Sequence, residues 1–126
     1  MIVIDPYSRA PIYEQVIGRI TELIMVGELK SGDKLPSVRM LARDLGVNPN
    51  TIQKAYAELE RRRIIYTVSG KGNFVGEPEV VSRQVCKRLL EEVGAAVRAA
   101  RRSGIEQETI SQLVNEVYEE KGGEHP

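Results

Sequence analysis

Residues 46–54 read Gly46-Val47-Asn48-Pro49-Asn50-Thr51-Ile52-Gln53-Lys54, which predicts a turn followed by a helix. Asn48 is a suitable N-cap, because its side chain can accept hydrogen bonds from the amides that open a helix. Pro49 fits the first helical position, where an N–H would have no intrahelical partner. The residues that recur at the spacing of one buried face are Ile52, Ala55, Tyr56 and Leu59.

The other face of this predicted helix is polar near its start. It carries Asn50, Thr51, Gln53 and Lys54. Amide, hydroxyl and ammonium groups at a helix N-terminus suit the major groove of DNA, where amides pair with base edges and the helix start can face a phosphate. The segment therefore indicates a helix that reads DNA.

A second helix is predicted immediately upstream, with Ser37 as its N-cap and Gly46 at its end. Its inward residues are Val38, Leu41, Ala42 and Leu45. Arg39 and Arg43 share its outer face, either as phosphate contacts or as solvated surface. Arg39 is the stronger candidate, because it lies close to the helix start. Two helices joined by a short turn form the helix-turn-helix arrangement, whose second helix enters the major groove.

A β-hairpin is predicted after the second of these helices. Two β-prone segments, 64–68 and 73–75, flank the turn Ser69-Gly70-Lys71-Gly72. In this position a hairpin forms a wing, and Lys71 at its tip can lie along a phosphate or in the minor groove. The alternative is that Lys71 only keeps the turn soluble, and the glycines certainly serve the turn.

The N-terminal part is predicted as an arm, residues 1–9, and a helix from Pro11 to about Val26. Gly27 stands where that helix would end. Its apolar positions are Ile12, Val16, Ile20, Leu23 and Ile24. The Gly- and Pro-containing segment 29–36 is predicted as an irregular connection.

The C-terminal part begins after Gly76-Glu77-Pro78 and predicts two amphipathic helices, ending near 101–104 and spanning 106–120. Two such helices cannot bury their apolar faces alone, because domains this small are marginal. A second copy of the chain would cover them; packing back on the N-terminal domain is the alternative. The candidate dimerisation residues are Val85, Leu89, Val93, Val97, Ile110, Leu113, Val114 and Val117.

Charge is unevenly distributed, although 18 basic and 18 acidic residues give a net charge of zero. Residues 34–76 hold 8 basic and 3 acidic residues, whereas residues 77–126 hold 7 and 10. A local basic face is the electrostatic footprint of nucleic-acid binding. The predicted partners are therefore a double-stranded DNA operator and a second copy of the chain.

Other function classes find little support. No nucleophile with a base, paired carboxylates or metal-ligand spacing is visible, so we expect neither an enzyme nor a cofactor. The single cysteine, Cys86, and the lack of an apolar run of membrane length favour a cytoplasmic protein without membrane contact. His125 in the tail receives no role. A winged helix used for protein contact within a larger complex is the competing interpretation.

The motifs together resemble the winged helix-turn-helix of GntR-type transcription regulators. The resemblance covers about residues 9–77, including Leu35 to Ala42, Val47 to Tyr56 and Gly70 to Val75. The short C-terminal part resembles the YtrA subfamily, in which two helices replace a larger metabolite-binding domain. This resemblance implies a repressor, control of a transporter operon and relief by a small effector. The implied DNA-binding residues are Ser37, Arg39, Asn48, Pro49, Asn50, Thr51, Gln53, Lys54, Gly70 and Lys71.

Two departures from the family pattern bear on the site. Ser69 stands where the subfamily often has arginine before the wing glycine, which argues against base reading by the wing. Arg61-Arg62-Arg63 stands where the recognition helix commonly ends at glycine, and the added charge would strengthen phosphate attraction.

The predicted fold is thus mainly α with a small β-hairpin wing. A winged helix-turn-helix DNA-binding domain (10–77) follows the arm (1–9). A two-helix dimerisation and effector domain (78–121) precedes a flexible tail (122–126).

Overall fold

The computed structural model describes residues 2–120, and the chain divides into two compact units between Cys86 and Lys87. The predicted tail and His125 lie outside the described residues. The predicted boundary at residue 78 differs from this division by about two helical turns.

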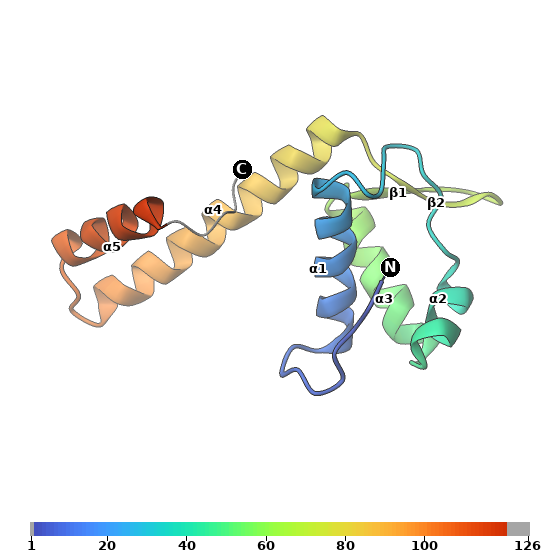
Figure 1. Cartoon of the computed structure of the whole chain (residues 1–126), viewed down its shortest axis with the longest axis horizontal. Coiled ribbons are helices and arrows are strands. Elements are labelled where there is room, and N and C mark those ends of the chain that lie inside the picture. Colours follow the sequence, from blue (N-terminus) through green and yellow to red (C-terminus); the bar gives the residue numbers. More distant parts are fainter. Residues whose placement is uncertain (1, 121–126) are drawn as a thin grey trace. The chain divides into compact units, whose positions relative to one another are not determined.

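The first unit contains the three helices expected from the sequence: α1 (Ile12–Met25), α2 (Val38–Leu45) and α3 (Pro49–Arg61). Ser37 caps α2 by accepting a hydrogen bond from the Met40 amide at 3.1 Å, and Gly46 ends the helix in the left-handed conformation with φ +70°. Asn48 caps α3 by accepting from the Asn50 amide at 2.8 Å, with Pro49 in the first turn. The predicted turn between α2 and α3 is therefore confirmed. In Figure 1, α1 and α3 lie side by side.

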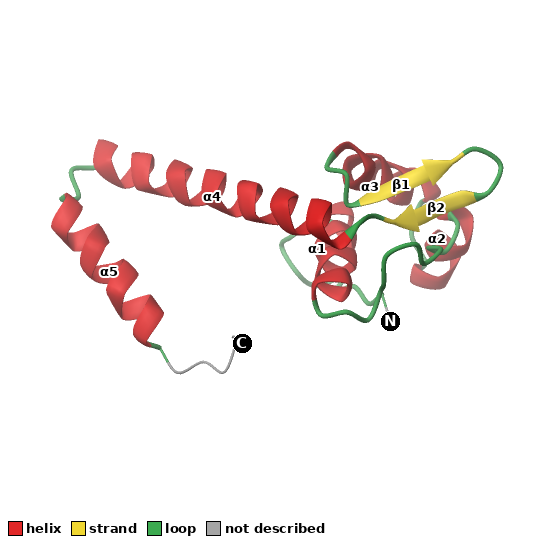
Figure 2. Ribbon diagram, turned by 90° about the horizontal axis from the view of Figure 1, so that it is seen from above, coloured by secondary structure: helices red, strands yellow, loops and turns green. Residues whose placement is uncertain are grey.

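The wing is an antiparallel pair of strands, β1 (Ile65–Val68) and β2 (Gly72–Val75), seen as two arrows in Figure 2. Tyr66 and Phe74 face each other in register and stack with ring centroids 5.7 Å apart. The segment before α2 runs along the other edge of β2, since the Leu35 amide donates to the Asn73 carbonyl at 2.8 Å. Pairing on both sides of β2 fixes the hairpin to the helices.

The core of the first unit is built from the faces that the sequence pattern marked as apolar. Its buried members come from all three helices, the connection before α2, the hairpin with the residue before it, and the helix that follows the hairpin: Val16, Ile17, Ile20, Leu35, Leu41, Ala42, Ile52, Ala55, Tyr56, Leu59, Ile64, Ile65, Val75 and Val81. No polar or charged residue of the described chain is buried. The free energy of folding of this unit therefore comes mainly from apolar burial.

The N-terminal arm is docked on the first unit. Ile2 and Ile4 pack against the core. The Gln15 side chain accepts from the Asp5 amide at 2.7 Å and donates to the carbonyls of Asp5 and Ala10 at 3.0 Å each. One glutamine on α1 thus holds the arm and the turn that follows it.

Helix α4 (Pro78–Arg102) begins in the first unit and continues into the second, which also holds α5 (Gln107–Glu119). Val81 is buried in the core of the first unit and Val85 packs against it. This contact explains why the division falls after Cys86. Val85, a candidate dimerisation residue, therefore makes a contact within the chain, which its spacing in the stripe did not indicate.

Candidate nucleic-acid interface

Helix α3 presents its polar residues to solvent because its apolar face is fully used. Ile52 and Leu59 are buried, while Asn50, Gln53 and Lys54 are exposed and Thr51 is half-buried. The Asn48 side chain is occupied by its cap, which leaves the exposed amides of Asn50 and Gln53 as possible partners for base edges. The first two turns of α3 thus have the chemistry expected of a DNA-reading surface.

Tyr56 sets the position of α3 against the residues that precede α2. Its hydroxyl donates to the Pro36 carbonyl at 2.8 Å, and burial raises the pKa of this phenol well above its usual value. The tyrosine remains neutral and hydrogen-bonded at all ordinary pH values. It therefore fixes the middle of α3 to the loop that leads into α2, one residue before the Ser37 cap.

Two arginines lie on the outer face of α2. Arg39 and Arg43 are exposed, and among residues 2–120 neither forms an ion pair. Ser37, two residues before Arg39, is the N-cap of α2. Both guanidinium groups are therefore available to an anion, and Arg39 lies in the first turn of the helix, as the sequence indicated.

The wing tip is a tight turn closed by a hydrogen bond from the Lys71 amide to the Val68 carbonyl at 2.9 Å. Gly70 has φ +76° and so occupies a conformation that glycine adopts without strain. Lys71 is exposed at this tip and forms no ion pair within the described chain. A cation is thus carried at the end of the hairpin.

The three arginines at the end of α3 contribute less free charge than the sequence suggested. Glu58 accepts hydrogen bonds from Arg61 and from Arg62 Nε, the latter at 2.7 Å. These bonds, with Arg61 contributing most, lower the pKa of the Glu58 carboxyl to about 2. Both arginines share the one negative charge of Glu58, so one of the three positive charges is offset locally, and only Arg63 has no carboxylate partner in the described part of the chain.

One contact in this region was missed by sequence reasoning. Lys54 Nζ lies 4.4 Å from the centre of the Tyr13 ring, which belongs to the first turn of α1. The two residues are 41 positions apart, and no short motif links them. A helix–helix packing prediction would have been needed to find this pair.

The family relationship follows from sequence comparison. Residues 12–75, which span α1 through β2, match the bacterial regulatory proteins of the gntR family. The chain belongs to the GntR family. It is thus a DNA-binding transcription regulator, and the family is a class of regulators rather than of enzymes.

Relatives of GntR type match both the sequence and the fold. The HTH-type transcriptional repressor YtrA of Bacillus subtilis (strain 168) is 42% identical, with 98% of this chain and 97% of the relative covered. A GntR family transcriptional regulator from Listeria monocytogenes aligns with a TM-score of 0.67 at 38% identity, over 90% of this chain and 98% of that one. The resemblance therefore extends beyond the winged helix to the C-terminal helices.

Some of the similar solved structures include operator DNA. The DNA-binding domain of AraR in complex with operator ORE1 aligns with a TM-score of 0.52 at 32% identity. The alignment covers 58% of this chain and 89% of that chain. The winged helix unit thus has the fold of a domain that has been solved with its operator.

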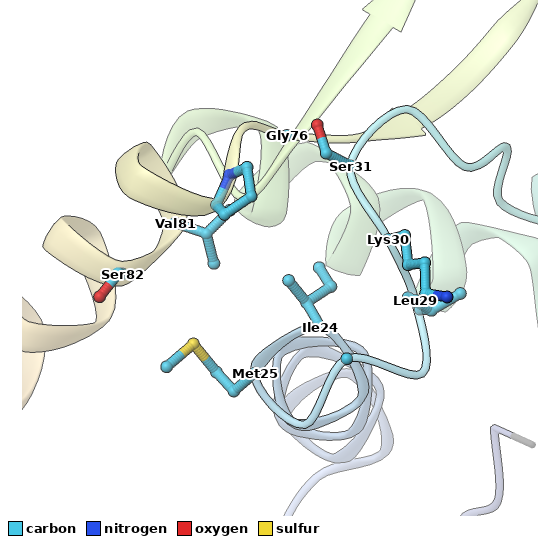
Figure 3. Close-up of a pocket in the computed structure, with 10 residues that line it drawn as sticks. Ile24, Met25, Leu29, Lys30, Ser31, Gly76, Val81 and Ser82 are labelled. Carbon is cyan, nitrogen blue, oxygen red and sulfur yellow. The ribbon is translucent and has the colours of Figure 1, made fainter.

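A cavity of about 380 Å³ lies in the first unit of this GntR protein, away from the polar start of α3. Figure 3 shows Ile24 and Met25, at the end of α1, on one side of it and Val81 and Ser82 of α4 on the other.

Within residues 2–120 there is no cluster of three or more metal-ligating side chains, and no helix is long and apolar enough to span a bilayer.

Proposed function

We propose that this chain is a homodimeric, sequence-specific repressor that binds a pseudo-palindromic operator and occludes a promoter. The observation that carries the proposal is the start of α3, where Asn50, Gln53 and Lys54 are exposed on a helix whose other face is buried. The kinship with a Bacillus repressor supports repression as the sign of regulation. A regulator of promoters works where the chromosome is, and we place it in the cytoplasm, without a catalytic activity.

The contacts divide by chemistry. Asn50 and Gln53 offer amides to base edges. Arg39 and Lys71, which form no ion pair within residues 2–120, offer their positive charges to backbone phosphates. The contribution of three further residues is through the backbone. Ser37 begins α2, and Asn48 with Pro49 begins α3, so that the free amides of these helix starts face the DNA. Thr51 and Gly70 complete the candidate set, as a flanking hydroxyl and as the turn that presents Lys71.

The test is a salt titration of binding to a duplex that carries the protein's own promoter and to a scrambled duplex of equal length. We expect the promoter to bind about 10³-fold or more tightly, and both affinities to fall with salt as counterions are released. Equal binding to both duplexes would contradict sequence-specific recognition of this promoter. No binding to either at low salt would favour a winged helix used for protein contact.

Two substitutions separate base contacts from phosphate contacts. Gln53→Ala should cost about 1–3 kcal/mol on the promoter and leave binding to the scrambled duplex nearly unchanged. Arg39→Ala should weaken binding to both duplexes and reduce the salt slope by about one. If Gln53→Ala weakened both duplexes equally, Gln53 would not be a base-reading residue.

Dimerisation is proposed for the second unit. Its helices carry apolar side chains that are about half exposed in the single chain, among them Leu89, Val93 and Leu113 at 55% each. Helix α5 has no buried residue at all. A two-fold pair of such chains would place two α3 helices about one DNA turn apart, which matches a pseudo-palindromic operator.

The cavity beside the start of α4 is our candidate effector site. Its lining joins the end of α1 to the first turns of α4, so a ligand there would redirect the helix that leads into the dimerisation unit. Met25 is half exposed at its rim, and Met25→Trp should fill the cavity without unfolding the protein. By analogy with the family, we propose that the native promoter is that of a transporter operon. With a reporter on this promoter, the variant should stay repressed under conditions that induce the wild type. Normal induction would place the effector elsewhere.

A further inference from the structure

The contact between Lys54 and Tyr13 joins α3, the proposed DNA-reading helix, to α1, which lies outside the helix-turn-helix motif of α2 and α3. Lys54 Nζ lies 4.4 Å from the ring centre of Tyr13. A cation within about 6 Å of an aromatic centre is attracted by the negative face of the ring. The ammonium of α3 is therefore held by α1.

Tyr13 is a fixed platform for this contact. The residue is half-buried and packs against the core of the first unit. Two residues further along α1, Gln15 holds the arm and the turn after it with three hydrogen bonds. Lys54 in contrast is exposed and forms no ion pair with any carboxylate of the described chain. The ring is thus the partner that restricts where this lysine points.

The direction of that restriction follows from helix geometry. Gln53 and Lys54 are consecutive, so their side chains leave α3 about 100° apart. Tyr56, one turn beyond Gln53, reaches the Pro36 carbonyl on the side of α2, whereas Lys54 reaches α1. Lys54 therefore stands at the edge of the polar face that is nearest α1, and Gln53 stands toward the other edge.

We propose that Tyr13 is a positioning residue that holds Lys54 toward a backbone phosphate at the edge of the groove, and away from the bases. The inference rests on the proposed function. The ring takes one side of the ammonium and leaves N–H donors free for a phosphate oxygen. Because the side chain is already confined, binding DNA loses less of its rotamer freedom, and this preorganisation is worth about 3-fold to 10-fold in affinity.

A double-mutant cycle tests this role on both the promoter and the scrambled duplex. Tyr13→Leu should weaken binding to the two duplexes by the same factor of about 3 to 10, because a phosphate contact carries no sequence information. Tyr13→Phe should bind like the wild type, because it keeps the ring. In a Lys54→Met background, Tyr13→Leu should have no further effect. In an Arg39→Ala background, the matched control, it should have its full effect.

Three results would overturn the proposal. The first is that the affinity losses of Tyr13→Leu and Lys54→Met add fully in the double variant. The second is that Tyr13→Phe loses as much affinity as Tyr13→Leu. The third is that Tyr13→Leu weakens binding to the promoter alone. Thermal unfolding of each variant shows whether it is folded. If Tyr13→Leu is unfolded, the ring-current shift of the Lys54 ε-methylene protons in the wild type decides: an upfield shift that persists on adding DNA supports the proposal, and its absence refutes it. Failure of the wild type to bind either duplex would instead refute the proposed function.

Discussion

Arg63 ends the recognition helix in a conformation that residues with a side chain rarely adopt. Its φ is +62°, and it is the one non-glycine residue with positive φ in the described chain. The Ile64 amide donates to the Leu59 carbonyl and the Arg63 amide to the Glu60 carbonyl, each at 2.9 Å, so the chain turns as it would at a glycine. Arg63 thus makes a turn typical of glycine at the cost of backbone strain.

Arg63→Gly should accordingly raise the free energy of unfolding by about 1 kcal/mol, because glycine holds the left-handed conformation without the Cβ penalty. Urea denaturation of the two proteins measures the difference. Arg62→Gly is the matched control: Arg62 has a right-handed backbone and an ion pair to Glu58, so the same change there should destabilise. A loss of stability in Arg63→Gly would show that the Arg63 side chain outweighs the strain.

Glu58 makes the stability of the first unit depend on pH. Because Arg61 and Arg62 lower its pKa from 4.5 to about 2, the folded state favours the charged carboxylate. Its stabilisation is complete above pH 4.5 and is lost as the pH falls toward 2. Glu58→Gln should lower the free energy of unfolding by about 0.5–1 kcal/mol at pH 7, since the pairs are near the surface. Urea titrations from pH 7 to pH 3 should show this difference shrinking below pH 4.5; a constant difference would assign it to packing.

At the scale of elements, the hairpin is joined to the end of α3 by a close backbone approach at Gly76. A Cβ atom there would lie 3.0 Å from the carbonyl oxygens of both Arg63 and Ile64. The Gly76 amide also donates to the Ile64 carbonyl at 2.9 Å. A side chain at residue 76 would therefore require these backbone atoms to move.

Gly76→Ala should therefore lower the free energy of unfolding by about 1–3 kcal/mol, because backbone atoms must move to admit the methyl group. Gly18→Ala is the control: this helical glycine has nothing within 4 Å of its Cβ position. There the same substitution should stabilise by about 0.5–1 kcal/mol through helix propensity. Thermal melts of both proteins give the signs, and a neutral Gly76→Ala would mean that the turn relaxes easily.

The elements that the sequence predicted well are those with local signals. Ser37, Gly46, Asn48 and Pro49 act within four residues of themselves, so their roles could be read without knowing what packs where. The contact of Tyr13 with Lys54 could not be read in this way, since it depends on how α1 crosses α3. The contact of Val85 with the core of the first unit could not be read either, because Val85 continues the same apolar stripe as Leu89 and only the packing of α4 distinguishes them.

At the scale of the whole molecule, the second unit has helices without a core. In residues 87–120, apolar side chains that a stable domain would bury remain exposed: Leu89, Leu90, Val93, Val97, Ile105, Leu113, Val114, Val117 and Tyr118. Exposed apolar stripes of this length mark an interaction surface. Because the stripe runs along both helices, one self-complementary contact with a second copy would cover it. Dimerisation is thus expected to complete the fold of this unit as well as to pair the reading helices.

Leu113→Glu places a charge in the middle of that stripe and should convert a dimer of twice 14.1 kDa into a monomer, as measured by light scattering after gel filtration. Gln112→Glu adds the same charge one position earlier, on the opposite face of α5, and should leave the dimer intact. In the dimer, two α3 helices bind the same operator, and a monomer loses this avidity. The promoter affinity of Leu113→Glu should therefore fall about 100-fold or more. Binding of one unit to a single half-site should persist with a smaller salt slope, because fewer phosphates are contacted. A Leu113→Glu protein that remains dimeric would show that α5 lies outside the interface, and a monomer with unchanged promoter affinity would show that one reading helix is enough.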